Sequence, residues 1–147
     1  MVCLGNICRS PLADGLLRQK VKKDNLDVIV DSCGTSDYHI GEQPDERMIK
    51  TALKHNYDIS NLRARQFTKQ DFKDFDVIYV MDSSNYNNVI ALADTEEDKQ
   101  KVKFFLNELH PNSNMAVPDP YFGGEQGFED VFKLVDQTTD IILKKLK

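Results

Sequence analysis

Residues 1–11 restrict the possible fold more than any other stretch of the chain. Their apolar start is typical of the end of a buried strand, and Pro11 suits the first turn of an α-helix. Between these two, Gly5 and Asn6 are the residue types that most readily adopt a positive φ, so the backbone can curl here. We therefore predict a strand, a curled loop whose N–H groups point inward as an anion nest, and then a helix.

Polar residues at the end of this loop predict a phosphate site with a nucleophile. A helix N-terminus offers free N–H donors and a partial positive charge, and Arg9 adds a planar fork for phosphoryl oxygens. The same surroundings favour the thiolate of Cys3, which is the nucleophilic form of cysteine. The hydroxyl of Ser10 can hydrogen-bond this thiolate and release it later as a leaving group. The alternative is a buried cysteine in a strand that is followed by an ordinary helix cap.

The composition excludes several classes of protein. The chain has 147 residues, enough for one domain over residues 1–147 with a real core, and its net charge of −5 argues against a nucleic-acid binder. It has no apolar run near the roughly 18 residues of a membrane span, and no signal peptide, so we expect no membrane contact. An odd count of three cysteines, none in a metal-type pair, favours the reducing cytoplasm.

Alternation of β-rich and helical runs predicts a parallel sheet covered on both faces. Besides the strand that ends at Cys3, we expect strands at residues 26–30, 76–81 and 102–106, and longer helices at residues 11–24, 44–55, 82–93 and 128–146. The stretch 95–98 is interpreted as a charged turn. In such sheets the site lies at the carboxyl ends of the strands, so Cys3, the loop 31–41 and Asp82 should converge there.

Asp119 is the candidate general acid for breaking a phosphate ester. It stands between Pro118 and Pro120, which stiffen the loop and could hold the carboxyl at one depth. A positioned acid typically contributes roughly 10²–10⁴-fold to such a reaction. Taken alone, the same stretch also fits a surface aspartate in a proline-rich turn.

The chain resembles the low-molecular-weight protein tyrosine phosphatases over almost its whole length. The resemblance is carried by residues 3–11 and 119–122, and by the stretches 31–38, 64–66 and 81–85 in the same order. It implies a three-layer α/β sandwich with a parallel sheet of about four strands in the order 2-1-3-4. It also implies hydrolysis of phosphotyrosine in proteins through a phosphocysteine, with Asp119 as acid and then as base.

The resemblance and the local chemistry together give the expected site. The expected catalytic residues are Cys3, Arg9 and Asp119, and the expected substrate-binding residues are Leu4, Gly5, Asn6, Ile7, Cys8, Ser10, Tyr38, Tyr121 and Phe122, the three aromatic residues being walls of a slot for an aryl ring. Asn6, Ser32 and Asp82 are expected to support the loop. No metal or cofactor is expected, because Arg9 and backbone N–H groups supply the positive charge. We expect a monomer that acts on tyrosine-phosphorylated proteins and releases inorganic phosphate.

Two features leave room for other interpretations. Only two residues precede Cys3, whereas a strand usually has about five, so either the start lies upstream or the first strand is clipped at the N-terminus. Cys8 could pack beneath the loop as a small hydrophobe, or it could form a redox disulfide with Cys3, which the family resemblance favours.

Three other functions fit parts of the sequence. A protein-arginine phosphatase on the same scaffold is associated with threonine at the position of Ile7, so isoleucine favours phosphotyrosine. An arsenate reductase would need shuttle cysteines, for which Cys33 is the candidate. A non-catalytic phosphate-binding module would not need both Cys3 and Asp119.

Overall fold

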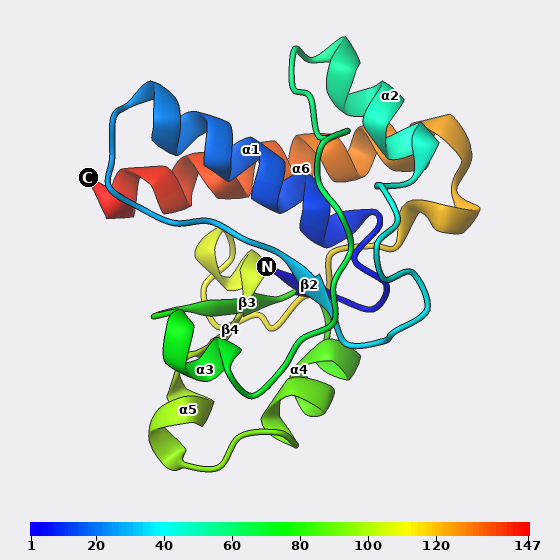
Figure 1. Cartoon of the computed structure of the whole chain (residues 1–147). Helices are drawn as coiled ribbons and strands as arrows, with labels where there is room; N and C mark the ends of the chain where they lie inside the picture. Colours follow the sequence, from blue (N-terminus) through cyan, green and yellow to red (C-terminus); the bar gives the residue numbers. More distant parts are fainter.

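Four short parallel strands form the middle layer of the described structure, a computed structural model that describes the backbone of residues 1–147 and every side chain except that of Phe122. They are β1 (Val2–Cys3), β2 (Cys33–Gly34), β3 (Ile78–Val80) and β4 (Val102–Phe104). Their order is β2-β1-β3-β4, which confirms the expected order 2-1-3-4 (Figure 1). β1 therefore lies in the centre, with the site at its carboxyl end.

Helices α1 (Arg9–Lys23), α2 (Glu46–Lys54) and α6 (Gly124–Leu146) lie on one side of the sheet (Figure 1). Apolar residues at helical spacing on α1 and α6 face each other and the sheet, and the two helices run side by side. The buried residues of this cluster include Leu12, Leu16, Val21, Met81, Phe105, Phe128, Val131 and Val135. This packing fixes α1, and with it the loop that leads into α1.

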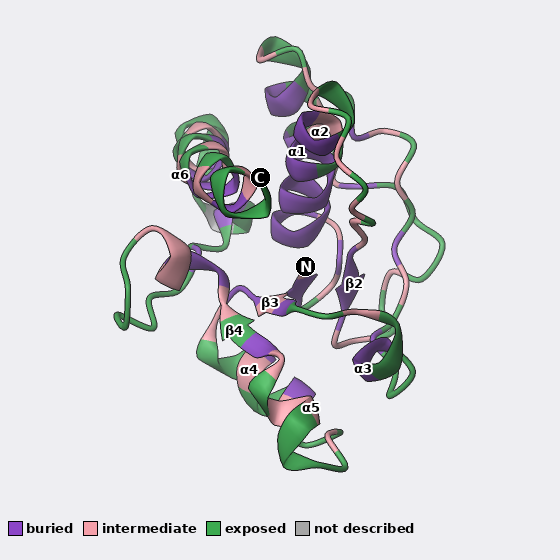
Figure 2. Ribbon diagram, turned by 90° about the vertical axis from the view of Figure 1, so that its left-hand side faces the viewer, coloured by how far each residue is buried: buried purple, intermediate pink, exposed green. Residues whose placement is uncertain are grey.

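The opposite side of the sheet carries α3 (Asp71–Asp74), α4 (Ser83–Ile90) and α5 (Glu96–Gln100). Side chains alternate along a strand, so Val2 and Val80 point to this side while Cys3 points to the other. The buried residues of the second cluster include Val2, Phe67, Phe72, Ile78, Val80 and Val89. Figure 2 shows the buried residues gathered between the layers, and the expected three-layer sandwich is confirmed.

Two expectations about single elements were wrong. Residues 26–30, expected to form a strand, are not part of the sheet, and β2 begins only at Cys33. The physical reason is that β1 starts at Val2, so residues 26–30 have no neighbouring strand to pair with. Residues 95–98, expected to be a charged turn, include the start of α5, where the hydroxyl of Thr95 accepts from the N–H of Asp98 at 3.1 Å.

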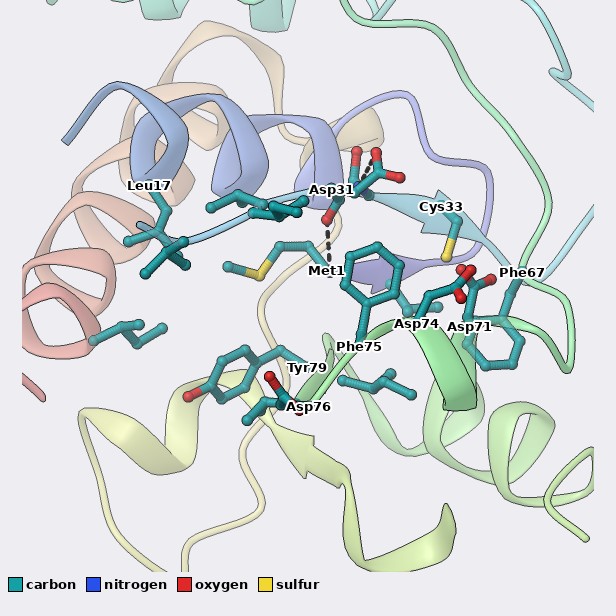
Figure 3. A pocket seen from close by; sticks show the side chains of 18 of the residues that line it. Met1, Leu17, Asp31, Cys33, Phe67, Asp71, Asp74, Phe75, Asp76 and Tyr79 are labelled. Carbon is teal, nitrogen blue, oxygen red and sulfur yellow. Dashed lines mark hydrogen bonds between the residues drawn. The ribbon is translucent and has the colours of Figure 1, made fainter. Parts of the chain in front are cut away.

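A cavity of about 480 Å³ lies at the amino edge of the sheet, beside the start of β1 (Figure 3). The extended residues 27–33 form one wall, and residues 74–79 form another. The terminal ammonium of Met1 donates to the carbonyl oxygen of Asp31 at 3.0 Å, and Cys33 N–H donates to the carbonyl oxygen of Met1 at 3.0 Å. The hydrogen-bond ladder between β1 and β2 thus reaches Met1 and stops at the cavity.

Short irregular segments complete the chain. The 3₁₀-helix η1 (Phe105–Glu108) follows β4, and the 3₁₀-helix η2 (Pro120–Phe122) precedes α6. Within the described chain, no helix combines the length and the apolar character that crossing a membrane would require.

Candidate active site

The loop of residues 3–10, here called the phosphate loop, turns from β1 into α1. Asn6 has a φ of 56°, in the left-handed region, whereas Gly5 does not. A Cβ at Gly5 would lie 3.0 Å from Cδ2 of His39, so a larger residue there would require the histidine ring to shift. The helix begins at Arg9 with Cys8 as N-cap, two residues earlier than expected. The curl and the helix N-terminus therefore lie next to each other.

Backbone donors of this loop are open for an anion. Within the described part of the chain, the N–H groups of Gly5, Ile7 and Cys8 donate to no protein acceptor. The N–H of Asn6 donates to Sγ of Cys3 at 3.3 Å, so the loop wraps around the sulfur. Unpaired N–H groups at a helix N-terminus are the arrangement that binds phosphate groups.

The sulfur of Cys3 also contacts a hydroxyl. Sγ of Cys3 lies 3.0 Å from Oγ of Ser10. Nδ2 of Asn6 donates to the same Oγ at 2.7 Å, so the hydroxyl proton has two acceptors within reach, the sulfur of Cys3 and the carbonyl oxygen of Cys33 at 3.3 Å. The N–H of Arg65 donates to Oδ1 of Asn6 at 3.1 Å and holds the amide in this orientation.

Arg9 is buried and held from one end of its guanidinium. Its Nη1 donates to Oδ2 of Asp82 at 2.8 Å and to the carbonyl oxygen of Val117 at 3.1 Å. Asp82 is itself fixed as the N-cap of α4, since it accepts from the N–H of Asn85 at 2.8 Å. Within the described residues, Nε and Nη2 of Arg9 have no protein acceptor, so two donors remain for phosphoryl oxygens.

A pocket of about 240 Å³ opens above Cys3. It is lined by Cys3, Leu4, Gly5, Ile7, Cys8, Arg9, Tyr38, His39, Asp119 and Tyr121. The structure thus brings together most of the expected site residues, while Asn6 and Ser10 are buried parts of the loop that do not line the pocket and that contact each other and Cys3. The side chain of Phe122 lies outside the described residues.

Aromatic side chains stand at the mouth of this pocket. Tyr38 is 76% exposed and Tyr121 is 50% exposed. The carboxyl of Asp119 accepts from the N–H of Tyr121 at 3.1 Å, as the N-cap of η2. An acid and two aromatic rings therefore border the entrance to the sulfur.

Two residues of the site were missed by sequence reasoning. His39, whose Nδ1 pairs with the carboxylate of Glu42, lines the pocket, and its position next to Tyr38 was the available signal. Gly34 in β2 packs against the phosphate loop, and a Cβ there would lie 2.6 Å from the carbonyl oxygen of Leu4. Only glycine allows this approach of two backbones.

The thiol of Cys8 lies in the same loop but in different surroundings. It is 6% exposed, and burial, followed by the nearby negative charges of Asp45, Cys3 and Asp119, raises its pKa well above the ordinary value. Burial likewise raises the pKa of Cys33 to about 12. Both thiols are therefore protonated at neutral pH.

Known proteins share this fold and sequence over nearly the full chain. A Synechocystis protein with the provisional name low molecular weight protein-tyrosine-phosphatase is 40% identical, over 99% of this chain and 93% of its own. The low molecular weight phosphotyrosine protein phosphatase of Schizosaccharomyces pombe is 41% identical, over 92% of this chain and 88% of its own. The crystal structure of an Entamoeba histolytica protein tyrosine phosphatase, with Hepes in its active site, superposes with a TM-score of 0.90 at 37% identity, covering 99% of this chain and 93% of that one.

A 2-1-3-4 parallel sheet with a cysteine at the base of the loop that follows β1 places the molecule among the small α/β protein tyrosine phosphatases. The sequence pattern that defines the low molecular weight phosphotyrosine protein phosphatases matches residues 1–147, and the chain belongs to that family.

Proposed function

We propose that this enzyme hydrolyses phosphotyrosine in proteins through a phosphocysteine on Cys3. One observation carries the proposal: the sulfur of Cys3 lies under unpaired N–H groups, 3.0 Å from the hydroxyl of Ser10, in a pocket that Arg9 and Asp119 also line. A nucleophile, an anion site and an acid in one pocket are the parts that phosphoryl transfer needs.

In the first step, the thiolate of Cys3 attacks phosphorus, and the bond between sulfur and phosphorus forms as the bond to the tyrosine oxygen breaks. Asp119 donates its proton to the leaving phenolate oxygen. The free donors of Arg9 and the loop N–H groups bind the phosphoryl oxygens, where negative charge collects in the transition state.

In the second step, Asp119 acts as the base. Its carboxylate takes a proton from water, the water oxygen attacks phosphorus, and the bond between phosphorus and sulfur breaks. The hydroxyl of Ser10 hydrogen-bonds the departing thiolate of Cys3, and inorganic phosphate leaves. Both steps use only groups of this chain, the substrate and water.

The mouth of the pocket favours an aryl ester. Tyr38 and Tyr121 border the entrance, and aromatic side chains pack well against a phenyl ring. Ile7 also lines the pocket and fits phosphotyrosine better than the threonine expected for phosphoarginine. The depth of the sulfur below these rings disfavours phosphoserine, whose phosphate is carried on a shorter side chain.

We also propose the setting in which the enzyme acts. Cys3, Cys8 and Cys33 are free thiols, which fits a reducing cytoplasm. Cys3, Arg9 and Asp119 come from one chain, so a monomer suffices for catalysis. Cys8 shares the phosphate loop with Cys3, and the two form a disulfide when Cys3 is oxidised.

The test is turnover of a phosphotyrosine peptide and of aryl phosphates. Cys3→Ser should abolish hydrolysis while the protein still binds vanadate, because a serine hydroxyl is not ionised near neutral pH. Cys33→Ala, which changes a buried thiol outside the pocket, is the matched control and should stay active. Substantial hydrolysis by Cys3→Ser would rule out the phosphocysteine.

The role of Asp119 has a separate test. Asp119→Ala should slow hydrolysis of phenyl phosphate by roughly 10²–10⁴-fold. The loss should be much smaller for 2,4-dinitrophenyl phosphate, whose leaving group needs no proton. An equal loss for both esters would argue against a role as general acid.

A further inference from the structure

Arg47, in the first turn of α2, connects the phosphate loop with the loop that carries Asp119. On one side, the N–H of Asp45 donates to the carbonyl oxygen of Ile7 at 2.8 Å, which joins the start of α2 to the phosphate loop. The carboxylate of Asp45 accepts from Nε of Arg47 at 3.2 Å and from Nη2 at 3.1 Å. The guanidinium is thus fixed, by two parallel contacts, to a residue that contacts the phosphate loop.

On the other side, the same guanidinium contacts η2. Nη1 of Arg47 donates to the carbonyl oxygen of Tyr121 at 3.2 Å. Its central carbon lies 5.1 Å from the ring centre of Tyr121 and 4.7 Å from that of Phe128, the latter a core residue of α6. These distances are those of cation–π contacts.

Tyr121 in turn fixes the carboxyl of Asp119, because its N–H donates to Oδ1 of Asp119 at 3.1 Å. Contacts therefore run from Ile7 through Asp45, Arg47 and Tyr121 to Asp119. Asp119 is exposed and caps the 3₁₀-helix η2, which packs against α6 and is joined to α2 through Arg47. Proton transfer requires heavy atoms within hydrogen-bond reach, so the position of this short loop decides how well the acid works.

We propose that Arg47 is a positioning residue, which holds the loop of Asp119 at the height above the phosphate loop where the carboxyl reaches the leaving oxygen. The inference rests on the proposed role of Asp119 and adds the residue that aligns it. Arg47 does not line the pocket, so its effect reaches the reaction through Tyr121 and Asp119. Lysine cannot replace it fully, because only the planar fork contacts Asp45, the Tyr121 carbonyl and two rings together.

The first measurement is kcat/KM for two esters with the same ring. Arg47→Ala should lose roughly 10- to 100-fold on phenyl phosphate, the loss typical of a misplaced catalytic group. It should lose far less on 2,4-dinitrophenyl phosphate, which needs no proton. Arg47→Lys should fall between wild type and Arg47→Ala. An equal loss on both esters would show that Arg47 only shapes the substrate wall and would overturn the proposal.

The second measurement is a double-mutant cycle with Asp119→Ala on phenyl phosphate. If Arg47 acts through Asp119, adding Arg47→Ala to Asp119→Ala should cost almost nothing. Additive losses would overturn the proposal. The Asp119→Ala single variant separates the role of Asp119 from that of Arg47. If this variant keeps the wild-type rate, the proposal that Asp119 is the acid is wrong. If it loses activity as expected but the losses in the cycle are additive, only the positioning role of Arg47 is rejected.

Two further variants serve as a control and as an alternative to Arg47→Ala. Arg63→Ala removes an exposed arginine that bonds only to the carbonyl oxygens of Ser60 and Leu62 within the described chain, and it should leave both rates unchanged. If Arg47→Ala does not fold, Asp45→Asn keeps the helix cap but weakens the hold on Arg47. Its loss should then be greater on phenyl phosphate than on the dinitrophenyl ester, and no difference would contradict the proposal.

Discussion

At the scale of single residues, Asn6 combines a backbone shape with side-chain chemistry. Its positive φ of 56° points its own N–H at the sulfur of Cys3. Its amide donates to Ser10 and accepts from the N–H of Arg65. Glycine would tolerate the φ but make neither side-chain bond, and aspartate would lack the donor. Asparagine is the residue type that meets both requirements.

Cys8 leads to the prediction that oxidation is reversible. Peroxide should oxidise the thiolate of Cys3 to a sulfenic acid, and the thiol of Cys8 should then attack that sulfur, release water and form a disulfide. After peroxide and then a thiol reductant, wild type should regain most of its activity and Cys8→Ser much less. Equal recovery would leave Cys8 as a packing residue.

Gly34 leads to a prediction about the shape of the phosphate loop. Gly34→Ala places a Cβ 2.6 Å from Leu4 O and 3.0 Å from Asn6 N, and neither backbone atom can move without shifting the loop. We expect a loss of at least about 1 kcal/mol in unfolding free energy, as for other overpacked sites, together with weaker vanadate binding.

The control for this substitution is Gly127→Ala in α6. A Cβ there would lie 3.6 Å from the carbonyl oxygen of Pro120, an ordinary contact, and alanine favours helix over glycine. Urea unfolding should show no loss for this variant. An unchanged Gly34→Ala protein would mean that the loop has more room than the distances indicate.

At the scale of elements, the N-terminus of α2 has a pH-dependent contribution to stability. Burial alone would raise the pKa of Asp45, but hydrogen bonds from the side chain and backbone of Arg47 outweigh it and lower the pKa below its ordinary value of 3.8. The charged carboxylate therefore stabilises the folded chain above pH 3.8, and this stabilisation is lost as the pH falls through the lower, folded-state pKa.

The measurement compares Asp45→Asn with wild type by urea unfolding at several pH values. Asparagine caps a helix as well as aspartate does, so the substitution keeps the cap and removes the charge together with one of the two acceptors for Arg47. We expect a deficit of up to about 1 kcal/mol at neutral pH that shrinks towards zero in strong acid. A deficit independent of pH would assign the effect to geometry rather than charge.

The cavity beside β1 predicts that a longer first strand would stabilise the sheet. The ladder already reaches the ammonium of Met1, and the walls beyond it are extended and partly apolar, with Phe75, Ile78 and Val28 among them. Four alternating apolar residues added before Met1 should enter the cavity, pair with residues 27–30 and raise Tm by several degrees, about 2–4 °C for each kcal/mol. Four glycine and serine residues added there serve as the control. Equal Tm values for the two extensions would contradict this use of the cavity.

At the scale of the whole molecule, the helices could be predicted from local spacing. α1, α2, α4 and α6 lie within a few residues of the expected ranges, because the apolar period of a helix is contained in its own sequence. The strand order came from the family resemblance, since pattern alone predicts only a parallel sheet. Residues 26–30 show why: a β-rich run forms a strand only where a neighbour exists, and β1 begins too late to supply one.

The residues of the candidate site fall into the same two groups, those predicted from local sequence and those that depend on contacts distant in sequence. Cys3 and Arg9 lie in one short motif, so their proposed chemistry follows from spacing. The proposed role of Asp119 also depends on the resemblance, because a proline-rich turn alone does not distinguish an acid from a surface aspartate. The proposed role of Arg47 and the close packing of Gly34 could not be predicted, since both depend on contacts with residues distant in sequence, Tyr121 and Leu4.

The packing of α1 against α6 has a consequence for biosynthesis. Nζ of Lys20 in α1 donates to Oδ1 of Asp136 at 2.7 Å and to Oγ1 of Thr139 at 2.8 Å, both in α6. Helix α1 leaves the ribosome early, but its packing partner α6 leaves last. Until then, the apolar face of α1 has no permanent cover and is open to chaperones and to neighbouring nascent chains. Cys3 is also made long before Asp119, and the phosphate loop and Arg9 are held in place only after Asp82, Val117 and α6 have been made. A growing chain on the ribosome is therefore kept from premature catalysis by the order in which its parts are made.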